Sequence, residues 1–431
     1  MTQASAAAEA SAERPRRTFA SLVRSTEVDT RLLGMIAALA IIWIGFNILS
    51  GGLFLTPRNL WNLSVQSSSI AIMATGMVLI IVSRNIDLSV GSMLGFVGYT
   101  MAMVQVMWFP DNPYTWAIAL VVGVAAGAAI GGFQGAIIAY LGVPAFIVTL
   151  GGYLVWRGLL FQYAQGQTLA PMDHIFALLG GGPTGALGQW GSWIVGVLAC
   201  VGIIYSLIAS RRRRRRYGFP LRPMWAEVTI GILGCGAVLG AVAIANAYPW
   251  PASLATSYAT THNITEPPGG LQIPTGIAFP VLIVIAVGLV MTFIATRRKF
   301  GRYVFAIGGN PEAAELGGIN VRRTIVSTYV LMGILVAISA AISTARLNAA
   351  VTSLGVQNEL DVIAAAVIGG TSFSGGIGTV PGAILGAVVM QSLRSGMVLL
   401  GLSSPVQDIV VGCVLVAAVG LDTIARRGRV R

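Results

Sequence analysis

The segment SRNIDLSVGSMLG, Ser83–Gly95, places a group of polar side chains between two long apolar runs. The polar residues are Arg84, Asn85, Asp87, Ser89 and Ser92. The Asp87 carboxylate can cap a helix that begins at Leu88, because it can accept hydrogen bonds from the unpaired N–H groups of the first turn. The neutral amide and hydroxyl groups beside it can also form part of the wall of a solute pathway. Both interpretations predict a polar helix junction at this point.

A second polar cluster lies just upstream in PRNLWNLSVQSSS, 57–69, and includes Asn62 and Gln66. Neutral donors and acceptors suit hydroxyl-rich solutes, which need several directional hydrogen bonds and no counter-charge. We therefore expect the two clusters to line one translocation pathway. The residues expected there are Asn62, Gln66, Asn85, Asp87, Ser89 and Ser92.

The composition indicates an integral membrane protein. Of the 431 residues, 55% are hydrophobic and only 10% are charged, whereas soluble domains carry about 25% charged residues. Apolar runs that can cross a hydrocarbon layer roughly 30 Å thick recur along the chain. We predict an all-α polytopic helical bundle with about twelve transmembrane helices, or alternatively ten if two of the spans are misread. The short, glycine-flanked run 358–372 is either a crossing or a broken helix. The twelve expected spans are 32–50, 63–83, 90–108, 115–140, 145–163, 190–209, 225–247, 276–296, 324–345, 358–372, 380–399 and 404–424.

The basic residues predict how the chain is oriented in the membrane. The net charge is +12, and 22 of the 27 Lys and Arg residues fall in four clusters. These clusters are 14–31, 211–222, 297–323 and 426–431. An even number of spans puts all four in the cytoplasm and leaves 165–189 and 248–275, which contain no Lys or Arg, outside. We interpret Arg211–Arg216 as a topology anchor at anionic membrane lipid, with docking of a partner as the alternative, and we expect no nucleic-acid partner.

The same pattern divides the chain into parts. Residues 1–31 are expected to form a disordered cytoplasmic tail and 426–431 a basic cytoplasmic tail, with both termini inside the cell. Residues 32–425 form the expected transmembrane domain, with a cytoplasmic loop at 297–323. Within that domain, Gly123, Gly127, Gly131 and Gly135 recur every fourth residue, which predicts close contact between this helix and a neighbouring backbone.

Residues that could perform catalysis are scarce. A phosphate-binding P-loop needs a lysine after its glycines, but the only lysine, Lys299, lies in the unrelated context TRRKFGR. The two histidines, His174 and His262, fall in the expected exterior loops and form no catalytic or metal-binding spacing. Most acidic residues lie at span ends, and Arg157 is the clearest charge within a span, a pattern that disfavours an ion-coupled carrier. We expect no enzyme activity, no cofactor and no metal site.

The loop RRKFGRYVFAIGGNPEAAELGGINVRRT, Arg297–Thr324, contains a short predicted helix. Asn310 is a good N-cap and Pro311 suits the first helical position, while Gly317 and Gly318 provide the end of a helix over PEAAEL. A short exposed helix between two spans is either an ordinary capped loop helix or a docking element for a soluble partner.

Three stretches together resemble the permease subunits of bacterial sugar ABC importers, the family of the ribose, galactose, arabinose and xylose permeases. They are IDLSVGSMLG (86–95), FGRYVFAIGGNPEAAELGGINV (300–321) and AAAVIGGTSFSGGIGTVPGAILGA (364–387), and the likeness runs from about residue 33 to 425. The resemblance implies that the predicted short helix is the coupling helix that rests on the ATPase subunit. The implied coupling residues are Gly309, Asn310, Pro311, Glu312, Ala313, Ala314, Glu315, Leu316, Gly317, Gly318, Ile319 and Asn320.

The resemblance also implies partners and a location. The partners would be ABC ATPase subunits, a periplasmic or extracellular sugar-binding protein, and a second copy of the chain, in the bacterial inner membrane. The motif SRNIDLSVGS and the extra basic loop and span within 210–250 are most similar to the xylose-type permeases. Xylose is therefore the first expectation for the solute. Ribose, another sugar and a nucleoside are alternatives, as are an ion-coupled secondary carrier and a membrane scaffold that transports nothing.

Overall fold

The computed structural model describes residues 30–264 and 267–427, in which the regular secondary structure is helical. Residues 1–29 of the expected N-terminal tail and 428–431 of the expected C-terminal tail lie outside the described residues. The elements are α2 (Thr30–Leu49), α3 (Pro57–Val82), α4 (Val90–Met103), the π-helical η1 (Val104–Trp108), α5 (Thr115–Tyr140), α6 (Ala145–Ala164), α7 (His174–Leu178), α8 (Gly188–Arg216), α9 (Met224–Asn246), α10 (Ala252–Thr261), α11 (Phe279–Arg297), α12 (Lys299–Gly309), α13 (Pro311–Leu316), α14 (Val321–Leu347), α15 (Asn358–Ile368), α16 (Val380–Leu399) and α17 (Ser404–Arg427).

Ten helices in the described part of the chain are long and apolar enough to cross a membrane, which confirms the all-α polytopic fold. The expected span 358–372 contains only the 11-residue α15. At about 1.5 Å of rise per residue, such a helix is too short to cross the hydrocarbon layer, so it is the broken helix that its flanking glycines indicated. The expected span 404–424 lies within α17, whose apolar part is Ser404–Ala417.

The described residues form two compact units. The smaller unit contains Trp193–Ala241, and there α8 and α9 lie antiparallel. An ion pair of 2.7 Å joins Arg211 to Glu227, and the thiols of Cys200 and Cys235 each approach the carbonyl oxygen of the other residue. All three cysteines of the chain are free thiols, so neither unit depends on a disulfide.

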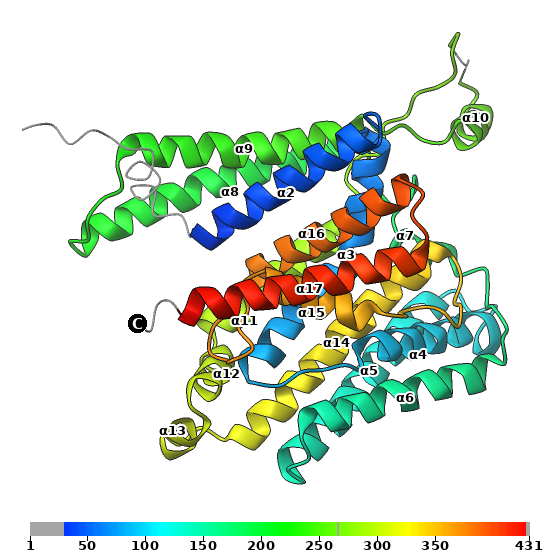
Figure 1. Ribbon diagram of the computed structural model, residues 1–431. Coiled ribbons are helices and arrows are strands. Elements are labelled where there is room, and N and C mark those ends of the chain that lie inside the picture. Colours follow the sequence, from blue (N-terminus) through cyan, green and yellow to red (C-terminus); the bar gives the residue numbers. More distant parts are fainter. Residues whose placement is uncertain (1–29, 265–266, 428–431) are drawn as a thin grey trace, which may run out of the picture. The chain divides into compact units, whose positions relative to one another are not determined.

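Helix α3 is central to the larger unit, which contains the described residues of Gly34–Ser192 and Val242–Arg431. Helices α11, α14, α15 and α16 all pack against it (Figure 1). In the most apolar window of α3, 94% of the residues are buried, compared with 11% in α6. A helix that is apolar on every side is stable in the interior of a bundle, which explains the central place of the run from Ile70 to Val82.

The glycine stripe of α5 lies against α14. A β-carbon on Gly127 would collide with the carbonyl group of Gly333, and one on Gly131 would collide with the carbonyl group of Tyr329. The predicted close approach of two backbones is therefore confirmed, and glycine is required here because any side chain would separate the helices.

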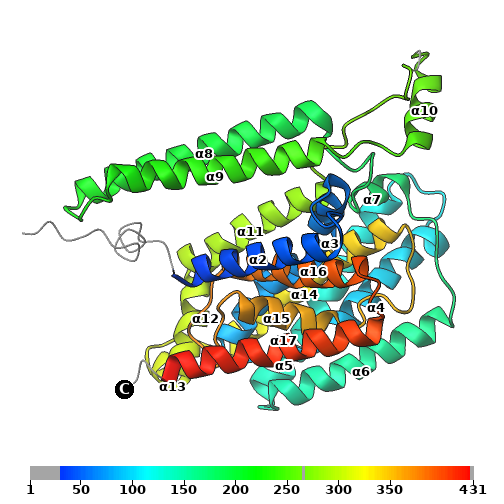
Figure 2. The same cartoon turned by 45° about the horizontal axis from the view of Figure 1, so that its top comes forward.

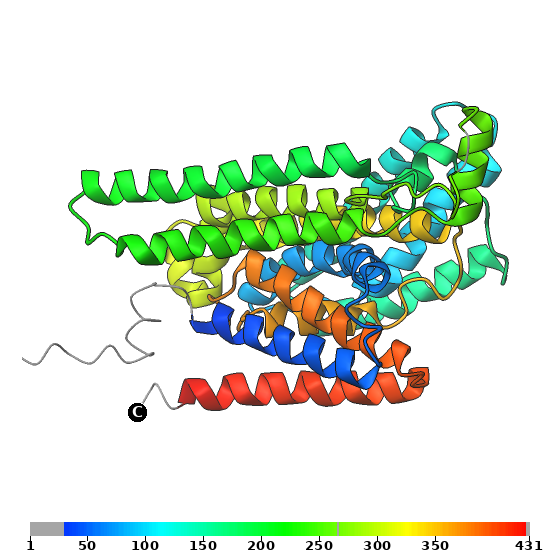
Figure 3. The same ribbon diagram turned by 90° about the horizontal axis from the view of Figure 1, so that it is seen from above.

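The larger unit has two distinct ends. Figures 1 and 2 both show α12 and α13 at one end and α7 at the other, and these are called the α13 end and the α7 end below. The sequence predicted only α13 in the loop 297–323, whereas the structure adds α12, an amphipathic helix that buries Val304 and Ile307. Helix α17 runs along one edge of the larger unit (Figure 3) and contacts α15 and α16.

Candidate functional site

A polar cavity lies between α3, α14, α15 and α16 in the larger unit. Its volume is about 300 Å³, at the lower end of the roughly 300–1,000 Å³ that is usual for ligand pockets. Its polar lining consists of Gln66, Ser69, Ser343, Arg346, Ser353, Asn358, Asp361, Gln391 and Arg394. Of the six residues expected in a pathway, only Gln66 is among those that line this cavity.

Helix α3 presents one polar face toward α16. Gln391 Nε2 donates a hydrogen bond of 2.9 Å to Gln66 Oε1, and Ser395 Oγ donates one of 3.1 Å to Asn59 Oδ1. Asn62 is half-buried one turn before Gln66 on the same face. These residues follow the spacing of i, i+3 and i+7 that brings side chains to one side of a helix, so the polar face of α3 continues beyond the cavity.

The wall between α3 and α14 is formed by three serines. Ser69 Oγ lies 2.6 Å from Ser339 Oγ and 2.9 Å from Ser343 Oγ, and Ser339 Oγ donates to the Ser69 carbonyl oxygen at 2.7 Å. Small hydroxyl side chains let the two helices approach closely and satisfy each other's polar groups inside the bundle. Ser69 lies at the end of the polar stretch 57–69, and no local pattern in the sequence indicates its partners on α14.

A charged cluster forms the opposite wall, and the sequence analysis missed it. Asp361 on α15 pairs with Arg394 on α16 at 2.8 Å. Asp408 on α17 lies 3.7 Å from the same guanidinium and accepts a hydrogen bond of 3.0 Å from Gln357 Nε2. The sequence showed Asp361 and Asp408 only as acids at span ends. The available signal was a single arginine within the otherwise uncharged run 380–399, because such a residue needs a partner.

Arg157, the charge noted within a span, holds the loop that borders the cavity. Its Nη1 donates hydrogen bonds of 3.1 Å to the carbonyl oxygens of Thr352 and Leu354. The loop after α14 is therefore fixed from α6 through Arg157 Nη1, whereas Arg157 Nη2 is buried and has no hydrogen-bond partner among the described residues.

The polar segment Ser83–Gly95 forms a separate, closed junction between α3 and α4. Asp87 is 1% exposed and Ser89 is fully buried. Asp87 Oδ1 accepts hydrogen bonds from the Ser89 N–H at 2.9 Å and from the Ser89 hydroxyl at 2.6 Å. Helix α4 begins at Val90 rather than at Leu88, and its N-cap is Ser89, so Asp87 closes a turn just before the helix instead of capping its first turn.

Neighbouring helices seal this junction. Ser89 Oγ donates to Gln134 Oε1 on α5 at 3.0 Å, and Thr149 Oγ1 on α6 donates to the Ile86 carbonyl oxygen at 3.3 Å. Burial raises the pKa of the Asp87 carboxyl, and the two hydrogen bonds from Ser89 oppose that rise. The structure thus brings Asp87 and Ser89 together with α5 and α6.

The other two expected residues of this segment are also engaged locally. Ser92 is fully buried and donates to the Ser89 carbonyl oxygen at 2.9 Å. Asn85 Nδ2 donates to the carbonyl oxygen and the hydroxyl of Ser83. None of Asn85, Asp87, Ser89 and Ser92 is among the residues that line the polar cavity, so pathway lining by them stays a prediction.

Helix α13 has the predicted cap and the predicted end. Asn310 Oδ1 accepts a hydrogen bond of 3.1 Å from the Ala313 N–H, and Pro311 occupies the first turn. The chain leaves the helix through Gly318, whose φ of +80° favours glycine. The outer face of the helix is open, since Glu312 and Glu315 are exposed and Leu316 is 91% exposed.

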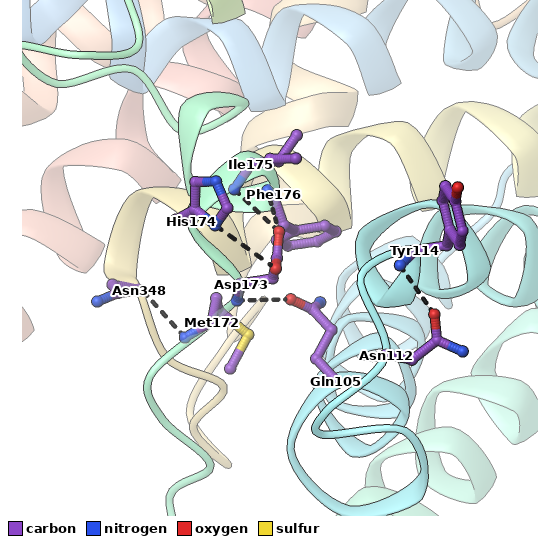
Figure 4. Close-up of polar contacts among 9 residues, drawn as sticks. All are labelled: Gln105, Asn112, Tyr114, Met172, Asp173, His174, Ile175, Phe176 and Asn348. Carbon is purple, nitrogen blue, oxygen red and sulfur yellow. Dashed lines mark hydrogen bonds and ion pairs between the residues drawn. The ribbon is translucent and has the colours of Figure 1, made fainter.

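At the opposite end, α7 is held by a network that Figure 4 shows. Asp173 Oδ1 caps α7 by accepting from the N–H groups of Ile175 and Phe176. Gln105 Oε1 accepts from the Asp173 N–H at 3.0 Å, and Asn348 Oδ1 accepts from the Met172 N–H at 3.0 Å. The exposed ring of His174 lies 3.8 Å from the Asp173 carboxylate. In the part of the chain that the structure describes, no three His, Cys, Asp or Glu residues are grouped as metal ligands.

Comparisons with known proteins identify relatives along most of the chain. The model of a family described as "Branched-chain amino acid transport system / permease component" matches residues 59–175 and 174–419. The xylose transport system permease protein XylH of Haemophilus influenzae is 36% identical over 396 residues, which are 92% of this chain and 97% of that protein.

Two further relatives come from Escherichia coli K12. Its xylose transport system permease protein XylH is 37% identical over 400 residues, 93% of each chain. Its ribose import permease protein RbsC is 31% identical over 369 residues, which are 86% of this chain and 87% of that protein. No solved structure is significantly similar to the chain.

Proposed function

We propose that this chain, which belongs to the family of branched-chain amino acid transport system permease components, is the membrane subunit of an ABC importer for a monosaccharide, with xylose as the first choice. The observation that carries the proposal is the match along nearly the full length of xylose transport permeases, at 36–37% identity and 92–93% of this chain. The family description names amino acids, but the individual relatives are sugar permeases.

The choice between xylose and ribose rests on a smaller difference, which is the difference in sequence identity to the permeases of these two sugars. The ribose permease of Escherichia coli is 31% identical over 86% of the chain, compared with 37% over 93% for the xylose permease of the same organism. Ribose is therefore the second candidate. Both sugars present neutral hydroxyl groups in every direction, so the amide and serine side chains of the cavity suit either of them.

The cavity offers a physical basis for this solute class. Gln66, Gln391 and the α14 serines supply neutral hydrogen-bonding groups. Arg394 is neutralised by Asp361 and so does not demand an anionic solute. Arg346 lines the same cavity, and the ion pairs of the described residues involve Arg394 and not Arg346, so the lining carries one further positive charge beside its neutral hydrogen-bonding groups.

The proposed assembly uses the two ends of the larger unit. ABC ATPase subunits would bind the exposed face of α13 at a cytoplasmic α13 end, and a sugar-binding protein would deliver solute at the α7 end. Two copies of the permease would enclose the path in the bacterial inner membrane. The chain would supply the gate and the ATPase the energy, in line with the lack of a P-loop in the sequence.

Reconstitution tests this proposal directly. Purified chain in proteoliposomes should accumulate no xylose under a proton or sodium gradient. It should accumulate xylose once the partner ATPase, ATP and the loaded binding protein are supplied. Accumulation by the chain alone would establish an ion-coupled carrier instead. Parallel uptake of labelled ribose with its own loaded binding protein separates the two solute candidates.

The docking surface has its own test. Glu312→Arg combined with Glu315→Arg reverses the charge of the α13 face without touching the Asn310 cap. The double variant should insert in the membrane normally but lose co-purification with the ATPase. Charge reversal of the exposed Asp111 on a different loop is the matched control. Wild-type co-purification of the α13 variant would contradict the docking assignment.

A further inference from the structure

Arg84 adopts a backbone conformation that residues with a β-carbon avoid. Its φ is +63°, at the position that follows the last turn of α3. The Arg84 N–H bonds to the Ile81 carbonyl oxygen at 2.9 Å and the Asn85 N–H to the Ile80 carbonyl oxygen at 3.1 Å. Helix ends of this kind normally use glycine. A strained residue at such a place persists only when its surroundings require it, so its side chain should have a role.

The Arg84 side chain bonds to the end of α12. Its Nε donates to the Gly308 carbonyl oxygen at 2.8 Å and its Nη2 donates to the Gly309 carbonyl oxygen at 2.7 Å. These two carbonyl groups end α12, and the next residue, Asn310, caps α13. Carbonyl groups at a helix C-terminus are unpaired and carry partial negative charge, which makes them good acceptors for a guanidinium. Arg84 therefore ties α3 directly to the base of α13.

The contact is reinforced by close packing of three segments. The Gly376 N–H donates to the Val82 carbonyl oxygen at 3.0 Å. A β-carbon on Gly308 would collide with that same carbonyl oxygen, and one on Gly375 would press on the stem of Arg84. The end of α3, the end of α12 and the glycine turn after α15 thus meet without intervening side chains, and interfaces this tight move together rather than deform.

Helix α3 continues from this contact to the cavity. Its residues are almost entirely buried, and Gln66 on its polar face lines the cavity wall. A displacement of α12 would therefore reach α3 and, through α3, the cavity wall.

We propose that Arg84 is the positioning residue that couples movement of α13 to the polar cavity. The proposal rests on the proposed function, because it takes α13 as the ATPase docking helix. Force applied to α13 would pull on the last carbonyl groups of α12, pass through the Arg84 guanidinium to the end of α3, and shift the cavity wall.

Three variants test this coupling. Arg84→Gly removes the guanidinium and its two hydrogen bonds but relieves the positive φ, so the variant should still fold and insert in the membrane. Arg84→Lys keeps the charge but cannot reproduce the planar fork. Gln165→Gly is the matched control, because Gln165 is an exposed residue with a φ of +45° at the end of α6.

The assay uses the full importer in proteoliposomes with its ATPase and loaded binding protein. Arg84→Gly should co-purify with the ATPase at the wild-type level but import about tenfold less solute per ATP hydrolysed, as expected when a coupling contact between two sites is lost. Arg84→Lys should import an amount of solute per ATP between that of Arg84→Gly and that of the wild type. Gln165→Gly should match the wild type. Wild-type import per ATP by Arg84→Gly, or a loss of import explained fully by lost ATPase binding, would overturn the inference.

A failure of the proposed function gives a different result. In that case the wild-type chain itself would neither bind the ATPase nor import solute with it, and the Arg84 variants would not differ from it.

Discussion

Two of the buried carboxylates of the larger unit, Asp87 and Asp361, have partners of opposite kinds. Asp87 is bonded to the backbone and hydroxyl of Ser89 within its own turn. Asp361 pairs at 2.8 Å with Arg394 on another helix and lines a cavity. The first group holds a chain segment in one shape, whereas the second holds two helices together and faces space that a solute can enter. The position of a carboxylate in the sequence therefore says less about its role than the identity of its partner.

The strongest test of this difference is Asp361→Ala. Removing Asp361 leaves Arg394 with only the more distant carboxylate of Asp408, 3.7 Å away, which should lower the free energy of unfolding by about 3 kcal/mol. Thermal unfolding in detergent measures the loss, and Asp111→Ala at an exposed position is the control. The double variant Asp361→Asn with Arg394→Gln should recover most of the stability. Equal losses for the single and double variants would show that the pair is not coupled.

Asp87→Ala should have the next largest effect. The Ser89 N–H and hydroxyl would lose their buried acceptor, at a cost of about 2 kcal/mol. Asp87→Asn keeps an acceptor oxygen in place and should restore most of that stability. Solute uptake, normalised to the amount of variant inserted in the membrane, then tests the prediction that Asp87 lines the translocation pathway. If Asp87→Asn imports solute normally, the junction serves the structure rather than the path.

Gln66→Ala probes the cavity with a smaller change in stability, about 1 kcal/mol, because it removes one neutral hydrogen bond. Its effect should appear instead as a raised solute concentration for half-maximal uptake. Ser92→Ala removes one neutral hydrogen bond, from the Ser92 hydroxyl to the Ser89 carbonyl oxygen, at the closed junction and is the matched control. If both variants weaken uptake equally, the distinction between cavity and junction fails.

The smallest expected effect is a dependence on pH. The pKa of Asp87 is higher in the folded chain than its ordinary value because the carboxyl is buried. Such a group favours folding below its unfolded pKa, and this contribution is lost as the pH rises through the folded pKa. Wild-type stability relative to Asp87→Asn should therefore fall with rising pH. A wild type that gains stability over this variant as pH rises would show that Asp87 is stabilised as a charged group.

Prediction from the sequence succeeded where the signal was local. The Asn310 cap, the α13 helix over PEAAEL and the glycine contacts of α5 follow from short-range rules, and the structure agrees with each. The sequence did not predict which side chains contact each other between helices. Asp361 and Arg394 are more than thirty residues apart, and Gln66 and Gln391 are farther still, so no spacing rule could join them into a cavity.

The sequence by itself determined that the chain is a membrane bundle, because long apolar runs leave the backbone no stable alternative in lipid. It also determined the local caps and turns. Only the tertiary structure decided which polar residues face each other, and that Arg84 reaches the end of α12. The physical reason is that apolarity acts on each segment alone, whereas hydrogen bonds and ion pairs between helices depend on how the helices pack together.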